Sequence, residues 1–410
     1  MTFIRDSKVQ LYIENNGVNS VVPDRYPFVN GLTKNALDKS GALYPRENPR
    51  YHYGNANTLF SFTFKVIQEI PYDRFYYPIV VSLTPVVDII ESLKINPMVT
   101  SAIRNGQCKI LLVSPYEGWS YKDFWKPLIQ KIKNVLRLTD DSFVIMDGGY
   151  LPNSDVINVT YNFWEENRLE DFVPKALGSI DKIRKHKFLC MNRRPSPHRM
   201  AMVTKLFDSK QQGILTMAEH GGFGHEFYKG MEQQFCEEFP ELIHEYSEKV
   251  IPKIPLIYND GIDPDVENPN YDDQLEKFHE SYLQIITETY YKNDTLFLSE
   301  KIFKPMWHCQ PFVVFGNPGT LKQLKKLGYK TFSKFIDESY DTEENNETRL
   351  DLLTASIKTF IRKTPEELTE ILMQMKPIFD HNLNNIDRRH GICIKLTLLN
   401  DLRSALYENA

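Results

Sequence analysis

The segment 296–316, which reads LFLSEKIFKPMWHCQPFVVFG, constrains the fold of this chain more than any other segment. Ser299 has a side chain that caps helix N-termini, and Glu300 supplies an acid for the first turn. Apolar residues then recur at helical spacing until Pro311, which we expect to stop the helix. The apolar run 312–315 has the length of a buried strand and is followed by a glycine. The segment therefore predicts a turn, a helix and a buried strand, as in an α/β sheet.

Glu300 and Lys301 stand side by side at the start of this predicted helix. The free N–H groups and the dipole of a helix N-terminus favour anions. A lysine at this end can contact a phosphate, and the neighbouring carboxylate can accept hydrogen bonds from ribose hydroxyls. The pair therefore suits a nucleoside diphosphate, whereas the alternative is an ordinary solvated first turn.

The length and composition indicate a globular protein of more than one domain. Its 410 residues exceed one typical core, so we expect two domains. A net charge of -5 argues against a strongly basic nucleic-acid coat but allows a local basic groove. The five cysteines form no CxxC pair, which argues against a zinc site and a disulfide scaffold, and Cys190 and Cys309 stand in apolar contexts typical of a core. The aromatic residues are scattered, so we attribute them mainly to packing. With no apolar leader and no run approaching ~18 apolar residues, we expect a cytoplasmic protein without a membrane span.

Buried-strand patterns alternate with helical patterns along the chain, which predicts an α/β fold with parallel sheets. In the first half we expect strands at 75–83, 108–114, 143–146 and 157–161, and helices at 86–93 and 121–137. In the second half we expect strands at 186–191, 213–217, 282–287 and 312–315, and a short extended segment at 331–336. We expect helices near 197 and at 317–327, 350–362, 365–383 and 394–407. The segment 219–273 is expected to be irregular. A charged connector between the halves places the domains at 1–175 and 176–410.

A second strand–turn–helix opening lies at the start of the second domain. Its turn and first helical residues include Arg193, Arg194, His198 and Arg199, behind the cap Ser196. Ligands of parallel sheets sit at the carboxyl ends of the strands, where phosphates meet helix N-termini and guanidinium groups. The alternative is that these arginines are solvated or pair with acids. Because both openings belong to one domain, we expect their helix N-termini to converge on one crevice.

The run 282–315 resembles the nucleotide-binding core of the fucosyltransferase-like glycosyltransferases. That family has a strand ending in an acidic loop, then an aromatic residue, Ser or Thr, Glu-Lys, a helix, a proline and a short apolar strand with glycine. The corresponding residues here are Glu288, Phe297, Ser299, Glu300, Lys301, Pro311 and Gly316, and the family's helix-opening arginine corresponds to Arg199. The whole pattern is also similar to uncharacterised glycosyltransferase-like proteins of phages and aquatic viruses.

The resemblance implies a GT-B fold, in which two Rossmann-like domains face a central cleft, with the acceptor domain first and the sugar-nucleotide domain second. It implies that Lys301 and Arg199 hold the diphosphate and that Glu300 holds the ribose. The other residues we expect in the nucleotide site are Arg194, His198, Glu288, Phe297 and Ser299. Lys304 and the Glu288-Thr289 pair depart from the family pattern, so the preferred base and sugar do not transfer.

Glycosyl transfer needs charge stabilisation on the leaving diphosphate and a base for the acceptor hydroxyl. Cations and a helix N-terminus can stabilise the charge on the diphosphate without a metal. No DxD motif with the character of a metal ligand stands out, and the pairs Asp140-Asp141 and Asp272-Asp273 have the character of surface or cap residues. We therefore expect no metal and no cofactor beyond the nucleotide-sugar co-substrate. For the base we favour Glu117, which follows the strand 108–114, and then Asp147. Either acid can instead serve a turn, and His52 and His198 are further candidates.

Three readings of the function follow from these residues. The first is a glycosyltransferase that uses a nucleoside-diphosphate sugar and acts on a glycan, or on hydroxymethylated DNA if the chain is viral and works in a host cytoplasm. Lysines on the predicted helix 121–137 could contact such DNA or form a solvated face. The second is a sugar-nucleotide epimerase of GT-B shape, which would turn over the donor alone. The third is a non-catalytic module that binds nucleotide or glycan. The oligomeric state stays open.

Overall fold

The computed structural model describes residues 2–5, 65–66, 74–80, 95, 97–114, 117–166, 180–219, 225–256, 275–292, 294–389 and 392–408. The chain divides into two compact units, one formed by Met1–Leu169 with Arg389–Ala410 and the other by Glu170–Arg388. Each unit has a parallel sheet with helices packed on it, which is a Rossmann-like arrangement and confirms the predicted α/β class. The predicted domain boundary at 175/176 and the predicted helix 86–93 lie outside the described residues.

The first unit is built on a six-stranded parallel sheet with the order β2-β1-β3-β4-β5-β7. Its strands are β1 (Thr2–Arg5), β2 (Lys65–Val66), β3 (Phe75–Val80), β4 (Cys108–Ser114), β5 (Phe143–Asp147) and β7 (Ile157–Thr160), and a short strand β6 (Gly149–Tyr150) follows β5. All seven residues of β4 are buried, as an uninterrupted apolar run predicts. The register brings Ser114, Asp147 and Thr160 to one edge of the sheet.

Helices cover both faces of this sheet. The helices of the first unit are α4 (Pro97–Arg104), α5 (Lys126–Leu136), α6 (Phe163–Glu166) and α15 (Ile392–Tyr407), and a helical turn at Tyr121–Trp125 leads into α5. Alternate residues of β4 point to opposite faces, so Ile110 and Leu112 join α4 and α5 in one core while Leu111 and Val113 join the other.

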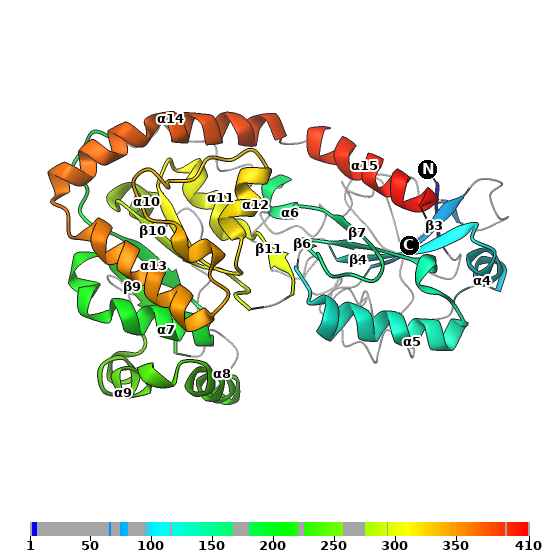
Figure 1. Cartoon of the computed structure of the whole chain (residues 1–410), viewed down its shortest axis with the longest axis horizontal. Helices are drawn as coiled ribbons and strands as arrows, with labels where there is room; N and C mark the ends of the chain where they lie inside the picture. Colours follow the sequence, from blue (N-terminus) through cyan, green and yellow to red (C-terminus); the bar gives the residue numbers. More distant parts are fainter. Residues whose placement is uncertain are drawn as a thin grey trace, which may run out of the picture. The chain divides into compact units, whose positions relative to one another are not determined.

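Helix α15 completes the second of these cores, as the red helix of Figure 1 shows beside β7. Its Leu398, Leu402 and Leu406 recur at helical spacing and are buried against the sheet. The Tyr76 hydroxyl donates a hydrogen bond to the Leu402 carbonyl at 2.7 Å. The prediction that 176–410 forms one domain is therefore wrong for α15, because this helix buries its apolar stripe in the first unit.

The second unit is built on a four-stranded parallel sheet with the order β12-β10-β8-β9. The strands of this sheet are β8 (Leu189–Asn192), β9 (Ile214–Met217), β10 (Gln284–Thr287) and β12 (Phe312–Phe315). The helices of the unit are α7 (Pro197–Leu206), α8 (His225–Glu238), α9 (Ile243–Glu245), α10 (Leu275–Glu280), α11 (Glu300–Trp307), α12 (Thr320–Lys326), α13 (Asn346–Ile361) and α14 (Pro365–Arg389). A short strand outside this sheet, β11 (Leu296–Phe297), precedes α11. Every residue of β10 and β12 is buried, so this pair forms the centre of the unit's core.

Three sequence predictions for the second unit were wrong in detail. The segment 219–273, expected to be irregular, contains α8, whose buried stripe is weak because Phe235 is its one fully buried side chain. The segment 331–336 forms turns and no strand. Helix α11 ends at Trp307, four residues before Pro311, and it accommodates Pro305 inside. Segments that are short or polar contain too few apolar residues for a hydrophobic period to be recognised.

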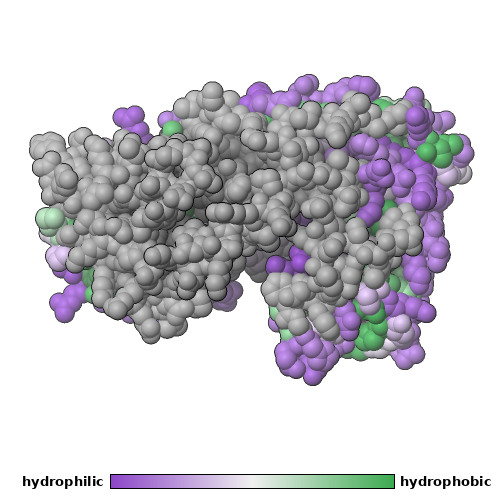
Figure 2. Space-filling view, turned by 180° about the vertical axis from the view of Figure 1, so that it is seen from behind, coloured by the Kyte–Doolittle hydropathy of each residue, from purple (hydrophilic) through white to green (hydrophobic). Residues whose placement is uncertain are grey.

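The part of the described surface that Figure 2 colours is mainly hydrophilic. In the view of Figure 2, purple residues predominate among those coloured, and green ones appear in small separate groups. Large hydrophobic side chains that are exposed, such as Val135, Ile183 and Tyr407, are far apart in the sequence. Among the described helices, none is long and apolar enough to cross a membrane.

Candidate functional site

The predicted site residues of the second unit lie at the carboxyl edge of its sheet. The register aligns the last residues of β8, β9, β10 and β12 at this edge. The Thr287 hydroxyl, at the end of β10, donates a hydrogen bond to the Asn192 side-chain oxygen at the end of β8. Helix α7 begins shortly after β8, and α11 follows β10 after a loop that contains β11. The two strand–turn–helix openings expected from the sequence therefore do share one edge.

Glu288 is the buried centre of this edge. It follows β10 and has no exposed surface. Its Oε1 accepts a hydrogen bond from the Ser299 backbone N–H at 2.8 Å, and its Oε2 accepts from the Ser299 hydroxyl at 2.6 Å and from the Thr289 N–H at 2.6 Å. A β-carbon on Gly316 would come within 3.2 Å of the Glu288 β-carbon, so a glycine at this position makes room for the acid. Glu288 thus ties the end of β10 to the start of α11.

Lys301 reaches back over the start of its own helix. Its Nζ donates to the Ser299 hydroxyl at 3.1 Å, to the Thr289 hydroxyl at 3.2 Å and to Glu300 Oε1 at 3.1 Å. Ser299 accepts a hydrogen bond from the Lys301 backbone N–H at 3.3 Å, which confirms it as the helix cap. The lysine side chain keeps 30% of its surface exposed, and Glu300 keeps 20%. Both charges therefore stay within reach of a ligand in solution.

The electrostatics of α11 keep Glu300 ionised. Burial acts to raise the pKa of Glu300, but Lys301 and Lys304 outweigh it and lower the pKa to about 2. Burial lowers the pKa of Lys304 to about 8, against the attraction of Glu300. Lys304 lies one helical turn after Glu300, and the sequence marked it only as a departure from the family pattern. Its place beside Glu300 and Lys301 was missed, because an i, i+4 pair by itself reads as a surface ion pair.

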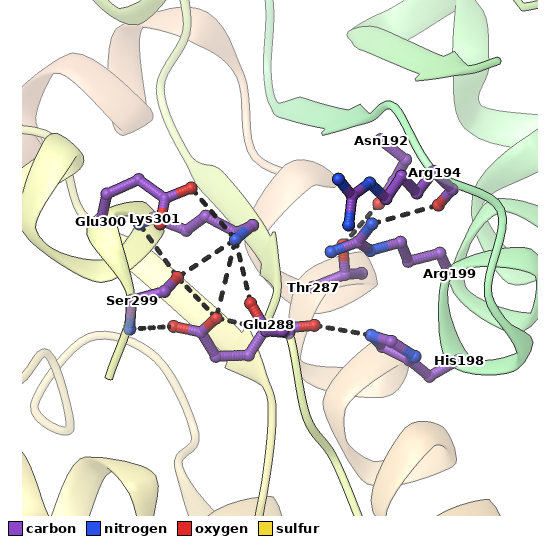
Figure 3. A network of polar contacts seen from close by, with 10 residues as sticks. Asn192, Arg194, His198, Arg199, Thr287, Glu288, Ser299, Glu300 and Lys301 are labelled. Atoms are coloured by element: carbon purple, nitrogen blue, oxygen red, sulfur yellow. Dashed lines mark hydrogen bonds and ion pairs between the residues drawn. The ribbon is translucent and has the colours of Figure 1, made fainter. Parts of the chain in front are cut away.

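Arg199 faces Lys301 from the other helix. Figure 3 shows the two side chains pointing toward one another, Arg199 from α7 and Lys301 from α11. Arg199 Nη1 donates to the Arg194 carbonyl at 3.1 Å. Arg199 Nε is buried without a hydrogen-bond partner among the described residues. Burial lowers the Arg199 pKa to about 10, with Glu288 opposing it, so the group stays charged at neutral pH. A partly exposed guanidinium with an unsatisfied buried N–H group is suited to an anion.

His198 is buried beneath this edge. Its Nε2 lies 2.7 Å from the Glu288 carbonyl, and its Nδ1 lies 3.2 Å from the Ser196 hydroxyl. A carbonyl only accepts, so Nε2 carries the proton and Nδ1 accepts from the serine. The ring stacks on Tyr291 with a centroid distance of 4.2 Å. Burial and nearby cations such as Arg199 hold the His198 pKa well below its usual value. The neutral ring therefore anchors the loop that follows β10.

The remaining residues predicted for the sugar-nucleotide site differ in their exposure. Arg194 is exposed, and its backbone carbonyl is the group that receives Arg199. Phe297 is buried, with its ring 5.9 Å from that of Tyr290. The geometry thus gathers Arg199, Glu300 and Lys301 as partly exposed charges, while Glu288 and Ser299 support them from below.

The two predicted bases lie close together in the first unit but differ in environment. Glu117 is half-buried and follows β4, and its carbonyl accepts a hydrogen bond from the Gly148 N–H at 3.0 Å. Asp147 is fully buried at the end of β5. Its oxygens accept from the Gly149 N–H at 2.7 Å and the Trp125 indole at 2.9 Å, and more weakly from the Trp119 N–H at 3.4 Å. Burial raises the Asp147 pKa well above its usual value, with these donors opposing it. Asp147 is thus placed to hold turns.

Other candidates are settled more briefly. His52 and Asp272-Asp273 lie outside the described residues. Asp140 pairs with Lys133 at 2.7 Å beside α5, as a surface acid would. The described residues contain no group of three or more His, Cys, Asp or Glu side chains arranged to hold a metal ion.

Comparisons with known proteins give weak structural likenesses. No protein-family model matches the chain, and none of the curated proteins matches it either. The structure is similar to the N-terminal domain of Candida albicans trehalose-6-phosphate phosphatase, at 11% identity and a TM-score of 0.40 over 86% of this chain and 73% of that one. An α1,3-fucosyltransferase matches at 10% identity and 0.32, over 80% and 84%. A UDP-forming α,α-trehalose-phosphate synthase from Burkholderia vietnamiensis matches at 10% and 0.37, over 98% of each chain. Scores at this level establish no shared activity.

Proposed function

We propose that this protein is a glycosyltransferase that uses a nucleoside-diphosphate sugar, with its donor site at the carboxyl edge of the second unit's sheet. The observation that carries the proposal is the convergence of Arg199 and Lys301, from two helix N-termini, beside an ionised Glu300. Two cations suit a diphosphate, and a carboxylate that stays ionised suits the hydroxyls of a ribose. This arrangement is what a sugar nucleotide requires of its binding site.

The same groups would serve the chemistry. As the sugar departs, negative charge grows on the diphosphate, and a preorganised lysine and arginine stabilise it more than they stabilise the bound donor. Lys301 is held in place by three hydrogen bonds, two to Ser299 and Glu300 at the start of its own helix and one to Thr289 after β10, so little reorganisation is needed. Because these two cations are already present to neutralise the charge on the diphosphate, we expect turnover to survive EDTA. Glu117 remains our candidate for the base that accepts the hydroxyl proton.

A panel of nucleoside diphosphates tests the donor site. We expect one of them to raise the melting temperature of the whole protein, because a ligand at 100 times its Kd stabilises by about 2.7 kcal/mol. The matching sugar nucleotide should then be consumed when an acceptor is supplied. Lys326→Ala, on the exposed side of α12, serves as the control for a lost lysine. If no nucleoside diphosphate or sugar nucleotide binds, the proposal is wrong.

The product of the reaction distinguishes the alternatives. Isomerisation of the sugar nucleotide without any acceptor would identify an epimerase. Binding without turnover, unaffected by a change at Glu117, would identify a non-catalytic module. The cytoplasmic location and the viral origin stay predictions, and hydroxymethylated DNA as the acceptor depends on that origin. The identities of the nucleotide and of the sugar stay open.

A further inference from the structure

A stacked aromatic pair lies at the carboxyl edge of the first unit's sheet, in the segment that carries Glu117. The rings of Trp119 and Phe124 lie with their centroids 4.5 Å apart and their planes at 19°. Both side chains pack against the core that α4 and α5 share with the sheet, and both remain partly exposed. The indole of Trp119 is thus presented at a strand end, two residues from the half-buried Glu117.

Trp119 is fixed by hydrogen bonds to two neighbouring strands. The Trp119 indole N–H donates to the Ser114 hydroxyl at the end of β4, at 2.8 Å. The Trp119 backbone N–H lies 3.4 Å from Asp147 Oδ2 at the end of β5. The Gly148 N–H joins the same two strand ends, because it donates to the carbonyls of Ser114 and Glu117 at 3.1 and 3.0 Å. The ring plane and the Glu117 backbone are therefore held in one rigid frame.

We infer that Trp119, supported by Phe124, is the subsite for a sugar ring of a carbohydrate acceptor, whose reacting hydroxyl faces Glu117. This inference rests on the proposed function. One face of a pyranose is made of C–H groups and stacks on an indole, while its rim of hydroxyls needs polar partners such as a carboxylate. In the transfer, the acceptor oxygen forms a bond to the anomeric carbon and the bond to the diphosphate oxygen breaks. The bonding pair leaves with the diphosphate, and the hydroxyl proton goes to Glu117.

The charges around the pair favour carbohydrate over DNA. Two of the lysines for which DNA contact and a solvated face were alternatives are paired with acids, Lys126 with Asp155 and Lys133 with Asp140, each at 2.7 Å. Affinity for DNA comes mainly from cations that neutralise phosphates, and these pairs remove two of them from that task. The surface of α5 at these two lysines therefore carries mixed charge rather than positive charge alone.

The test uses the whole protein with the nucleoside diphosphate that stabilises it. The probes are methyl β-lactoside, methyl β-N-acetylglucosaminide, methyl α-mannoside and a DNA duplex that contains 5-hydroxymethylcytosine. Binding is followed by the Trp119 indole N–H signal in NMR, which is assigned by its loss in Trp119→Phe. We expect a glycoside to shift this signal and Trp119→Ala to weaken that glycoside about tenfold. Tyr407→Ala, an exposed aromatic outside the pair, should leave the affinity unchanged.

Other results would overturn the inference. They are a glycoside that binds without moving the Trp119 signal, a glycoside bound equally by Trp119→Ala, and binding of the duplex alone. If nucleoside diphosphate binds and no glycoside does, the acceptor assignment fails while the donor site stands. If no nucleoside diphosphate binds, the failure lies in the proposed function. The NMR signal comes from the unmutated chain, so a poorly folded Trp119→Ala does not prevent a decision.

Discussion

Lys301 brings a positive charge into a set of oxygen atoms from Thr289, Ser299 and Glu300. The resulting arrangement leaves its ammonium group fixed but partly exposed, which is what a phosphate-binding lysine requires. Arg199 differs, because its Nε is buried with no hydrogen-bond partner among the described residues. We therefore expect both cations to contribute to phosphate binding, Lys301 through its ammonium group and Arg199 through its planar guanidinium group.

We expect Lys301→Ala to weaken nucleoside-diphosphate binding about 10- to 100-fold, since a charge-assisted hydrogen bond contributes about 1.5–3 kcal/mol. Arg199→Lys should also weaken it, because an ammonium group cannot reproduce the planar fork of a guanidinium. Titration calorimetry measures both. A plain nucleoside, which has no phosphates, should bind the two variants and the unmodified protein alike. Unchanged diphosphate affinity in Lys301→Ala would remove this lysine from the site.

Glu117 and Asp147 should separate in a comparison of two isosteric changes. Glu117→Gln keeps the size of a half-buried side chain, so transfer should fall about 10²–10⁴-fold while stability and donor binding persist. Asp147→Asn leaves buried donors facing an amide nitrogen, which costs about 1–3 kcal/mol for each donor left unpaired. We therefore expect Asp147→Asn to lower the melting temperature. Loss of transfer in Asp147→Asn at full stability would instead support Asp147 as the base.

At the scale of elements, α11 combines a helix N-terminus with three charges. Burial lowers the pKa of Lys304 to about 8, so this lysine loses its proton between pH 7 and 9, while Glu300 stays ionised throughout. The protonated form attracts a diphosphate, so the affinity should fall about fivefold as the pH rises through 8. Lys304→Met should bind weakly at pH 7 and show a flat profile. A steady affinity from pH 7 to 9 in the unmodified protein would argue against this role.

The elements predicted best from the sequence are those whose pattern is strong and local. The strand 108–114 was placed correctly because seven consecutive residues are buried on both faces of a sheet. Ser299 was identified as a cap because few side chains satisfy a helix start. Helix α8 was missed because one fully buried aromatic in 14 residues leaves almost no stripe. The Trp119 pair was read as packing, since a sequence does not show which aromatic stays partly exposed.

The other features that the sequence did not predict depend on burial and on partners that are distant in the chain. Nothing in the neighbourhood of Asp147 indicates that it would meet an indole N–H from 22 residues earlier in the chain. The amphipathic pattern of α15 predicts a helix with one buried face, but it does not say which sheet receives that face. Contacts of this kind are set by the tertiary fold.

At the scale of the whole molecule, the two units should respond separately to change. Leu402 of α15 is 1% exposed in the first unit's core, so Leu402→Ala should destabilise that unit by about 2–5 kcal/mol. Nucleoside-diphosphate affinity, which belongs to the second unit, should stay within about twofold. Calorimetric unfolding with and without nucleoside diphosphate can follow both. A ligand that restores the stability lost in Leu402→Ala would show that the units are not independent. Leu352→Ala, on the partly exposed side of α13, is the matched control.

The return of α15 to the first unit also sets an order of completion during synthesis. Tyr76, Leu111 and Val144 form an apolar sheet face early in the chain, and the leucines that cover it come after residue 397. The second unit is one continuous stretch in between, and all of its strands have been made by residue 315. Domains fold as their residues become available. The strands of the first unit therefore leave the ribosome before the second unit is made, yet one face of their sheet stays uncovered until α15 has followed.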